Sequence, residues 1–518
     1  MNEGPTIVDA AEFRQTLDAR ASAVLDVAGR LLVAPDTDAA LDLLTRPMVA
    51  LVLSEASQLE ELLDAYGALR NERWRPFRRV VAAMKLFARV HYSLLHLDHT
   101  APSYRLLPVE GDLGAALLKA RRFTARVLRI ASRRLLDAGT QLGLAPRPVA
   151  VCEERLPAGC LPQDCARRHV GDVAGTVAKL ATAFLNLADE ASALASPAWA
   201  GVAGQPLPAL LEETELRRLA EDFHNLQALY DTHVAYTDVE QSDPELPSLR
   251  GHASVVYHLL ETATDLTHYH ERHVLHAAAP GDAVPLFADK PESIEPERLE
   301  AALRECSLTF AARYVLAGRA LAQQLLRRYA EEGEITVAVP RYRGFHVRPS
   351  TLVARIAYHY GSPVAMRIED ESYDAASPLD LFRANELINA KKRRWLAQEI
   401  ARLVDVGGED LGGNVARAVR GVLLRLAEEG KIIVYERPLP KVEGQLHDGQ
   451  TVLSFVVEAV ARLQALGKID IVTPVNATFR GDRRVLADLQ LLASSGYGED
   501  AYGNNVALPK ELQYLRRR

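Results

Sequence analysis

The string Gly344-Phe345-His346-Val347-Arg348-Pro349-Ser350 brings an imidazole and a guanidinium close together in the chain. Alternating apolar residues over 335–339 predict a strand before it. Apolar residues spaced by three and four over 349–360 predict an amphipathic helix after it. We therefore expect His346 at the N-terminus of a helix, where the helix dipole disfavours imidazolium and leaves a neutral nitrogen nucleophile.

The same position suits a phosphoryl group. The first backbone N–H groups of a helix have no partner inside the helix and can bind phosphoryl oxygens. The Arg348 guanidinium is always charged and can stabilise the phosphoryl group during transfer. Pro349 fits the first turn, where its missing N–H costs nothing. The string therefore provides a nucleophile, an anion-binding cradle and a fixed cation within four residues.

This string also resembles the active loop of the histidine-containing phosphocarrier (HPr) family, Gly-Leu-His-(Ala/Thr)-Arg-Pro followed by a helix. The resemblance covers residues ~335–437 and includes a strand at 363–369, a helix opening at Ser377 and a last helix at 413–428. In a departure from the family, no clear strand precedes this last helix, and a strand follows it at 431–435 instead. It implies an α+β open-faced sandwich. It also implies that His346 accepts phosphate from a phosphoenolpyruvate-dependent Enzyme I or another phosphotransferase-system protein.

The resemblance makes Ser377 the counterpart of the family's regulatory serine. The surroundings differ, because Ser377 lacks the family's preceding lysine and is followed directly by Pro378. The helix that follows is also longer than in the family.

The remaining chain predicts a multidomain protein. Residues 1–332 show helical periodicity broken by proline-rich stretches, which predicts an all-α region with a candidate sub-boundary near 145–168. The HPr-like domain is expected at 333–440. Residues 441–518 are expected to form a small α/β C-terminal extension.

The composition restricts the class of protein. With 518 residues and a formal net charge of −7, the chain is long enough for several domains and has no basic excess that would favour nucleic acid. Four cysteines cannot form a disulfide framework in a chain of this length. The first residues lack a secretory signal and no apolar run has the length of a membrane span, so a cytoplasmic location without membrane insertion is expected. No cofactor is expected.

A second candidate site lies in the helical region. His258, Glu261, Asp265 and His268 recur along one helix stripe, and the preceding helix carries Glu221 and His224. Facing helices with such pairs can bind a metal in a helical bundle. The alternative interpretation, which we favour because the pairs are unmatched, is a polar seam between helices.

Three further patterns carry an ordinary structural interpretation. The first is Cys152, Cys160 and Cys165 with His169, whose spacing fits no compact zinc knuckle. The second is the stripe of Arg122, Arg126, Arg129 and Arg133, which is typical of a solvated helix face. The third is the Gly/Tyr-rich segment 496–505, which is expected to dock on the body of the domain.

Three functions therefore stay open. The first is a phosphoryl-accepting regulator or carrier in a phosphotransferase-type relay. The second is a scaffold that keeps the HPr shape without being phosphorylated, which a buried His346 or a diverging Arg348 would favour. The third is a metal-dependent enzyme in the helical bundle.

Overall fold

The computed structural model describes residues 7–150, 161–162, 164, 166–195, 211–275, 296–406, 415–435 and 450–516. The chain divides into two compact units, Met1–Ala322 and Gln323–Arg518. We call them the helical unit and the sheet unit. The division falls about ten residues before the expected boundary at 332, and the expected sub-boundary near 145–168 does not separate two units.

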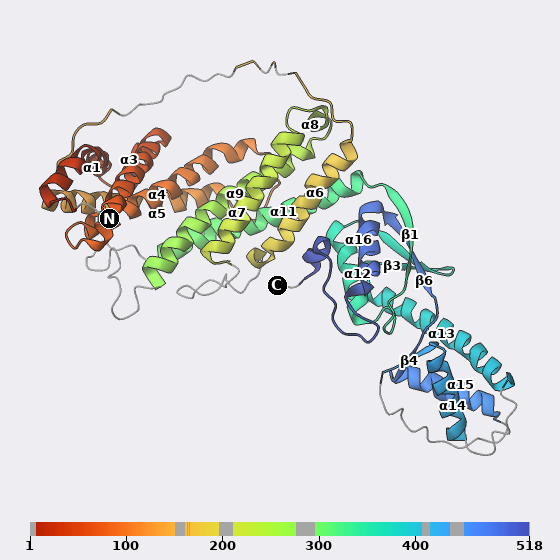
Figure 1. The fold of residues 1–518 in the computed structure, drawn as a ribbon. Coiled ribbons are helices and arrows are strands. Elements are labelled where there is room, and N and C mark those ends of the chain that lie inside the picture. Colours follow the sequence, from red (N-terminus) through yellow and green to blue (C-terminus); the bar gives the residue numbers. More distant parts are fainter. Residues whose placement is uncertain are drawn as a thin grey trace, which may run out of the picture. The chain divides into compact units, whose positions relative to one another are not determined.

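The described part of the helical unit is built from helices, as expected (Figure 1). They are α1 (Ala10–Val33), α2 (Thr37–Leu43), α3 (Arg46–Ala65), η1 (Ala68–Arg70), α4 (Arg75–Thr100), η2 (Ala101–Ser103), α5 (Leu113–Leu142), α6 (Val173–Glu190), η3 (Ala191–Ala195), α7 (Glu213–His233), α8 (Asp238–Ser242), α9 (Glu245–Tyr269), η6 (His270–Leu275), α10 (Pro296–Ala301), η8 (Ala302–Leu308) and α11 (Thr309–Arg328).

Long apolar stripes pack these helices together. Helix α4 lies against α3, α5 and α9, and α7 lies along α9. The start and end of α5 show how the sequence sets the bounds. Asp112 caps its first turn by accepting a hydrogen bond from the Ala115 N–H, and Gly143 ends it in the left-handed conformation that glycine adopts readily.

The sheet unit contains two antiparallel sheets (Figure 1). Its elements are β1 (Glu332–Ala338), α12 (Val347–Tyr360), β2 (Val364–Ile368), β3 (Glu371–Asp374), α13 (Pro378–Val406), α14 (Val415–Glu428), β4 (Ile432–Val434), α15 (Val452–Ala465), β5 (Ile469–Ile471), β6 (Asn476–Asp482), α16 (Arg483–Ser494), η9 (Gly496–Gly498) and η10 (Lys510–Leu515). The larger sheet has the order β1-β6-β2-β3 and the smaller one pairs β4 with β5.

One face of the larger sheet is covered by helices and the other is open. The strand register aligns Ile335, Phe479, Met366 and Tyr373 in one row across the four strands, and the last three are buried. Helix α16 packs on β1 and β6, α13 packs on β2 and β3, and α12 contacts both helices. The next row on the other face, Thr336, Thr478, Arg367 and Ser372, is polar and largely exposed.

Two elements assigned to this sheet from the sequence belong elsewhere. The strand expected at 431–435 is β4, which pairs with β5 in the smaller sheet, and the helix expected at 413–428 is α14, which packs on α15 and β4. The strand that completes the larger sheet is β6, followed by α16. The assignment failed because local periodicity identifies a strand but does not identify its pairing partner.

The region 441–518 is therefore not an independent extension. Its strand β6 lies between β1 and β2, so the C-terminal region supplies a central strand. Residues 395–475, which we call the insert, have their own core, formed by the second half of α13 with α14, α15, β4 and β5.

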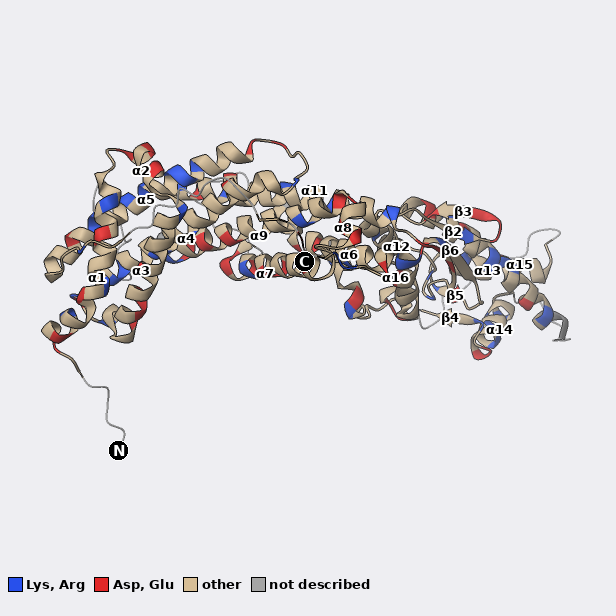
Figure 2. Cartoon of the chain, turned by 90° about the horizontal axis from the view of Figure 1, so that it is seen from above, with Lys and Arg blue, Asp and Glu red and all other residues tan. Residues whose placement is uncertain are grey.

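Lysine or arginine positions and aspartate or glutamate positions are interspersed along the helices (Figure 2). Among the helices of the described residues, none has both the length and the apolar character needed to cross a bilayer.

A buried histidine makes the helical unit sensitive to acid. The His91 ring on α4 is fully buried, and its Nδ1 lies 2.7 Å from Thr124 Oγ1. The Thr124 hydroxyl donates to the Arg121 carbonyl, so Nδ1 of His91 carries the hydrogen. Burial, helped by the Arg121 charge, lowers the pKa of His91 to about 3. Burial also lowers the pKa of His252.

We predict that the helical unit loses stability as the pH falls below about 6.5, because the unfolded histidine binds a proton there and the native one does not. Each such residue contributes a slope of up to about 1.4 kcal/mol per pH unit. Urea unfolding read from Trp74, in the full chain with Trp199 and Trp395 replaced by phenylalanine, measures this slope.

His91→Leu should flatten the slope, because it removes one titrating group and leaves no unsatisfied hydroxyl donor at Thr124. His99→Gln, an exposed change on the same helix, is the matched control and should leave the slope unchanged. An acid slope in the leucine variant equal to that of the parent chain would contradict this assignment.

Candidate functional site around His346

The loop before His346 is fixed by a left-handed turn. Arg343 and Gly344 both have positive φ, 53° and 63°. A Cβ at Gly344 would lie 2.1 Å from Asn385 Oδ1, so only glycine fits there. Asn385 on α13 holds both sides of the turn: its Oδ1 accepts the Phe345 N–H at 2.9 Å and its Nδ2 donates to the Arg343 carbonyl at 3.1 Å.

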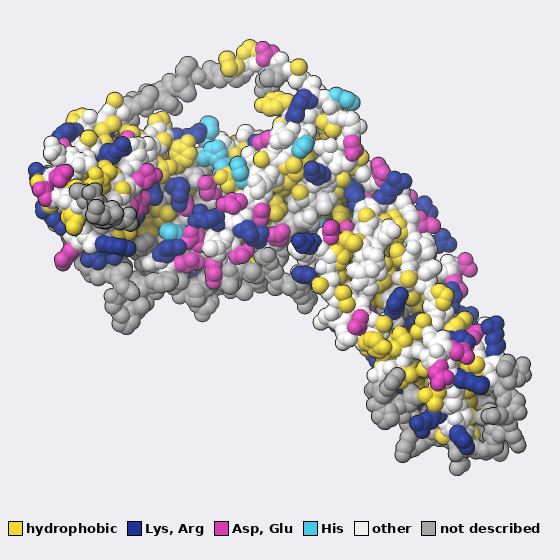
Figure 3. Space-filling model, viewed as in Figure 1, with side chains coloured by type: hydrophobic (Ala, Val, Ile, Leu, Met, Phe, Trp, Pro, Cys, Tyr) yellow, Lys and Arg dark blue, Asp and Glu magenta, His cyan; other side chains and the backbone are white. Residues whose placement is uncertain are grey.

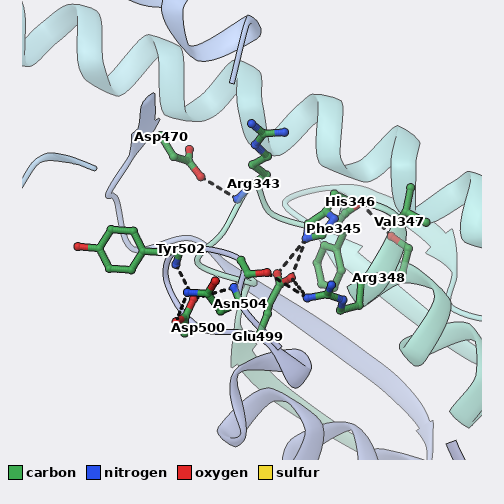
Figure 4. Close-up of polar contacts among 12 residues, drawn as sticks. Arg343, Phe345, His346, Val347, Arg348, Asp470, Glu499, Asp500, Tyr502 and Asn504 are labelled. Atoms are coloured by element: carbon green, nitrogen blue, oxygen red, sulfur yellow. Dashed lines mark hydrogen bonds and ion pairs between the residues drawn. The ribbon is translucent and has the colours of Figure 1, made fainter. Parts of the chain in front are cut away.

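His346 is the N-cap residue of α12, as the sequence predicts. Its ring makes no capping hydrogen bond with the described residues of the first turn. Its Nε2 instead lies 2.9 Å from Oε1 and 3.0 Å from Oε2 of Glu499 (Figure 4). The His346 side chain keeps 26% of its surface exposed, so the ring is accessible but held from one side.

Arg348 lies on the same carboxylate. Its Nη1 is 3.4 Å from Glu499 Oε2 and donates to the Gly503 carbonyl at 3.2 Å. The Arg348 side chain is 38% exposed, whereas that of Glu499 is only 1% exposed. The site thus contains an accessible imidazole, a half-exposed guanidinium and a buried carboxylate between them (Figure 4).

The C-terminal segment brings Glu499 to this place. The Tyr497 hydroxyl donates to the Ala338 carbonyl at the end of β1, and its ring lies 5.7 Å from the buried Phe345 ring. Asp500 then closes the following loop by accepting hydrogen bonds from the Tyr502 and Asn504 N–H groups. Hydrogen bonds from the Asn504 side chain and backbone hold the pKa of Asp500 below its usual range.

The insert also holds the loop. Asp470 of β5 accepts the Arg343 N–H at 2.9 Å through Oδ2, and its Oδ1 lies 3.0 Å from Lys392 Nζ on α13. Both charged side chains are almost fully buried, with 3% and 4% exposed. The Tyr342 ring lies edge-on to Tyr435 just after β4 and edge-on to His346. Contacts from the insert therefore reach the backbone and ring next to His346.

This arrangement can present a nucleophilic nitrogen. Within the described residues, no hydrogen bond engages Nδ1 of His346, while Nε2 is taken by Glu499. The first turn of α12 begins with the Val347 and Arg348 N–H groups, which have no acceptor within the helix, and Val347 is 68% exposed. An anion could thus approach from solvent toward free amides and a cation.

Sequence reasoning found His346 and Arg348 but missed the groups that hold them, Glu499, Asn385 and Asp470. The Gly/Tyr-rich segment that contains Glu499 does dock on the unit, as expected, and its docking role was identified without its chemical one. The only local indication of this role was the presence of a carboxylate, Glu499, within the Gly/Tyr-rich segment.

Ser377 lies where a helix begins. Its hydroxyl oxygen accepts the Asp380 N–H at 3.2 Å, and its own N–H donates to the Asp374 carbonyl. These bonds cap α13, so the structure gives Ser377 a local structural role.

The candidate metal ligands of the helical unit do not come together at one point in the described chain. Asp265 forms a salt bridge with Arg89, and His268 Nδ1 lies 2.9 Å from Glu213. Burial raises the pKa of Asp265 despite Arg89. In the parts of the chain that the structure describes, no group of three or more such side chains is placed to hold a metal ion. The helix stripe is a polar seam that links helices.

The other candidates of this seam form a row of rings. Figure 3 shows histidine side chains gathered on the visible face of the helical unit. The His224 ring lies 4.8 Å from Tyr257, which lies 4.6 Å from His258, which lies 4.4 Å from His96. Burial opposes ionisation of Glu261, but its hydrogen bond with His258 and the Arg89 charge lower its pKa. Glu221 is exposed.

The remaining motifs carry no chemistry in the described chain. Arg122 pairs with Asp38, and Arg129 donates to the Ala34 carbonyl, so the arginine stripe ties α5 to neighbouring segments. His169 lies 2.5 Å from Asp238. Cys152, Cys160 and Cys165 lie outside the described residues.

Comparison with known proteins gives no further guide. No known protein family's profile matches the chain, and no curated protein and no solved structure matches it either.

We predict that Gly344→Ala destabilises the loop by about 1–2 kcal/mol from the left-handed backbone alone, and further by displacing Asn385. Hydrogen exchange of the Phe345 amide in the full chain should increase. Gly421→Ala, on the exposed side of α14 with open space around its Cα, is the control and should be neutral or stabilising. Unchanged protection of Phe345 in the Gly344 variant would refute the role of this turn.

We predict that Asp470→Asn costs about 3–5 kcal/mol of stability in the sheet unit, because it leaves the Lys392 ammonium buried without its anion. Urea unfolding read from Trp395, with the other tryptophans replaced, measures this loss. Adding Lys392→Met should recover most of it, since the asparagine oxygen can still accept the Arg343 N–H.

Glu332→Gln provides the matched surface control. Its pair with Arg480 is exposed on both sides, so the change should cost less than about 1 kcal/mol. Equal losses in the two single variants would show that the buried pair has no special weight.

Proposed function

We propose that this protein is a phosphoryl-accepting regulator or carrier of a cytoplasmic phosphotransferase-type relay, with His346 as the acceptor and Arg348 as the stabilising cation. The observation that carries the proposal is the accessible His346 ring at the N-terminus of α12, with Nδ1 unengaged among the described residues and Arg348 beside it. These groups are those that a phosphoryl acceptor requires.

The topology of the sheet unit supports the resemblance to the HPr family. A strand, a helix, a two-stranded hairpin, a helix, a strand and a last helix build one antiparallel sheet with helices on a single face. This agrees with the open-faced sandwich that the resemblance implies, once the insert is left aside. The proposed donor is an Enzyme I-like phosphoprotein.

The size of the chain favours regulation over free diffusion between partners. The insert contacts the loop through Asp470 and Tyr435, and these contacts give a change of charge at His346 a route to a separate subdomain. A phosphoryl group adds roughly two negative charges, enough to reorganise nearby ion pairs.

A scaffold that is never phosphorylated is the second candidate. One observation favours it: the Glu499 carboxylate lies beside both His346 and Arg348, where it competes with an incoming anion for the cation. The partly exposed His346 ring, whose Nδ1 has no hydrogen bond among the described residues, favours the acceptor.

We predict that the full chain, incubated with phosphoenolpyruvate and Enzyme I, acquires one acid-labile, base-stable phosphate that is absent in His346→Ala. Arg348→Ala should slow labelling by about 10- to 100-fold, since a hydrogen bond to a charged group contributes about 1.5–3 kcal/mol. Radiolabel from phosphoenolpyruvate, followed by peptide mapping, measures both effects.

His169→Ala is the control for a histidine that is exposed and bonded to a carboxylate outside the site, and it should label like the parent chain. An unlabelled parent chain in the presence of an active Enzyme I would leave the scaffold as the better account.

A further inference from the structure

The buried carboxylate of Glu499 has no explanation in the sequence motif. Its side chain is 1% exposed, its carboxylate oxygens contact His346 and Arg348, and its charge also acts on the nearby Tyr435 hydroxyl. An ionised carboxylate only accepts hydrogen bonds, so the nitrogen 2.9 Å away must carry a hydrogen. The contact therefore distinguishes the two ring nitrogens of His346.

We propose that Glu499 is a positioning residue that holds the proton of His346 on Nε2, makes Nδ1 the accepting atom, and balances the positive charge that the ring gains when it is phosphorylated. This inference rests on the proposed function. The role is that of a carboxylate that orients an imidazole and stabilises its cation without taking its proton.

In the proposed step, a phosphoryl group moves from a donor nitrogen to Nδ1 of His346. The Nδ1 lone pair attacks the phosphorus of a phosphohistidine-type donor, the new N–P bond forms, and the donor's N–P bond breaks with its electron pair leaving on the donor nitrogen. The Nε2 hydrogen of His346 stays in place. The ring becomes a phosphoimidazolium, and the Glu499 carboxylate beside Nε2 offsets its charge.

The same contact affects the onward step. A phosphohistidine is labile when its ring is protonated, and a buried carboxylate favours that protonated ring. Arg348 is 38% exposed and lies 3.4 Å from Glu499, so it can turn toward the phosphoryl oxygens by giving up this contact and its 3.2 Å hydrogen bond to the Gly503 carbonyl. In this proposal Glu499 stabilises the charge of the ring, and Arg348 binds the phosphoryl oxygens.

The C-terminal segment fixes Glu499 rigidly enough for this role. The Tyr497 hydroxyl anchors the segment to Ala338, and Glu499 pairs with Asn505 in a short antiparallel bridge. A Cβ at Gly503 would lie 2.7 Å from the Tyr342 ring, so this loop packs closely against the residue that flanks His346.

The test uses the full chain and phosphoramidate, a small chemical phosphoryl donor that needs no protein partner. Alkaline digestion of the labelled protein separates the two phosphohistidine isomers. We expect the Nδ1 isomer in at least about tenfold excess in the parent chain. Glu499→Gln should label about tenfold more slowly and give both isomers, because an amide can donate or accept at Nε2.

The pH profile of phosphate release separates positioning from a merely structural effect. In the parent chain, rapid release should persist to higher pH than in Glu499→Gln, because only the carboxylate favours the protonated ring. Glu499→Asp keeps the charge and should restore the profile in part. Glu332→Gln, an exposed carboxylate of the same unit, should change neither isomer nor profile.

Two results would overturn the inference: labelling of the parent chain on Nε2, or an identical isomer and pH profile in Glu499→Gln. A measurement on the unphosphorylated chain keeps it independent of the relay. Nitrogen-15 shifts of His346, assigned by difference from His346→Gln, should show hydrogen on Nε2, and hydrogen on Nδ1 would refute it. Failure of every donor to label His346 would instead remove the proposed function.

Discussion

The position of β6 between β1 and β2 is the constraint on which the sheet unit depends. Residues near 480 in this strand pair with residues near 335, so the larger sheet is complete only when the chain that follows the insert pairs with β1 and β2. Because α16 and the Glu499 segment follow β6 directly, the same pairing brings the carboxylate to His346. The motif from His346 to Arg348 is local in sequence, but the candidate site is assembled by a contact that spans some 150 residues.

The insert is therefore part of the site even though it lies outside the larger sheet. A segment of this length could have formed a surface loop, because lengthening a loop adds little entropic cost to folding. Instead it has its own core and reaches back through the buried Asp470–Lys392 pair to the Arg343 amide. A buried ion pair contributes little net stability, and its value here lies in fixing one geometry of the turn. The shape of the loop before His346 is thus set from two sides, by Asn385 and by Asp470.

Local patterns could predict much of this arrangement. The periodicity around His346 predicted the strand, the helix and the N-terminal position of the ring, and periodicity also predicted the helices that the structure describes within the first 322 residues. Strand β6 was missed because its apolar residues, Ala477 and Phe479, are few and polar residues separate them. A central strand with one open face needs only one apolar side, and its partners are far away in sequence. Glu499 was missed for the same reason, since nothing local marks a carboxylate as buried.

The charges around His346 explain why one residue cannot be assigned a role without the others. With a neutral ring, Glu499 and Arg348 cancel, and the buried carboxylate is tolerated because two donors face it. A phosphoryl group would draw Arg348 outward and leave Glu499 facing the ring alone. That would be costly unless the ring itself became positive, and a ring phosphorylated on Nδ1 with hydrogen on Nε2 is positive. Under the proposed phosphorylation of His346, the carboxylate that competes with an incoming anion for Arg348 would therefore also balance the charge of the phosphorylated ring.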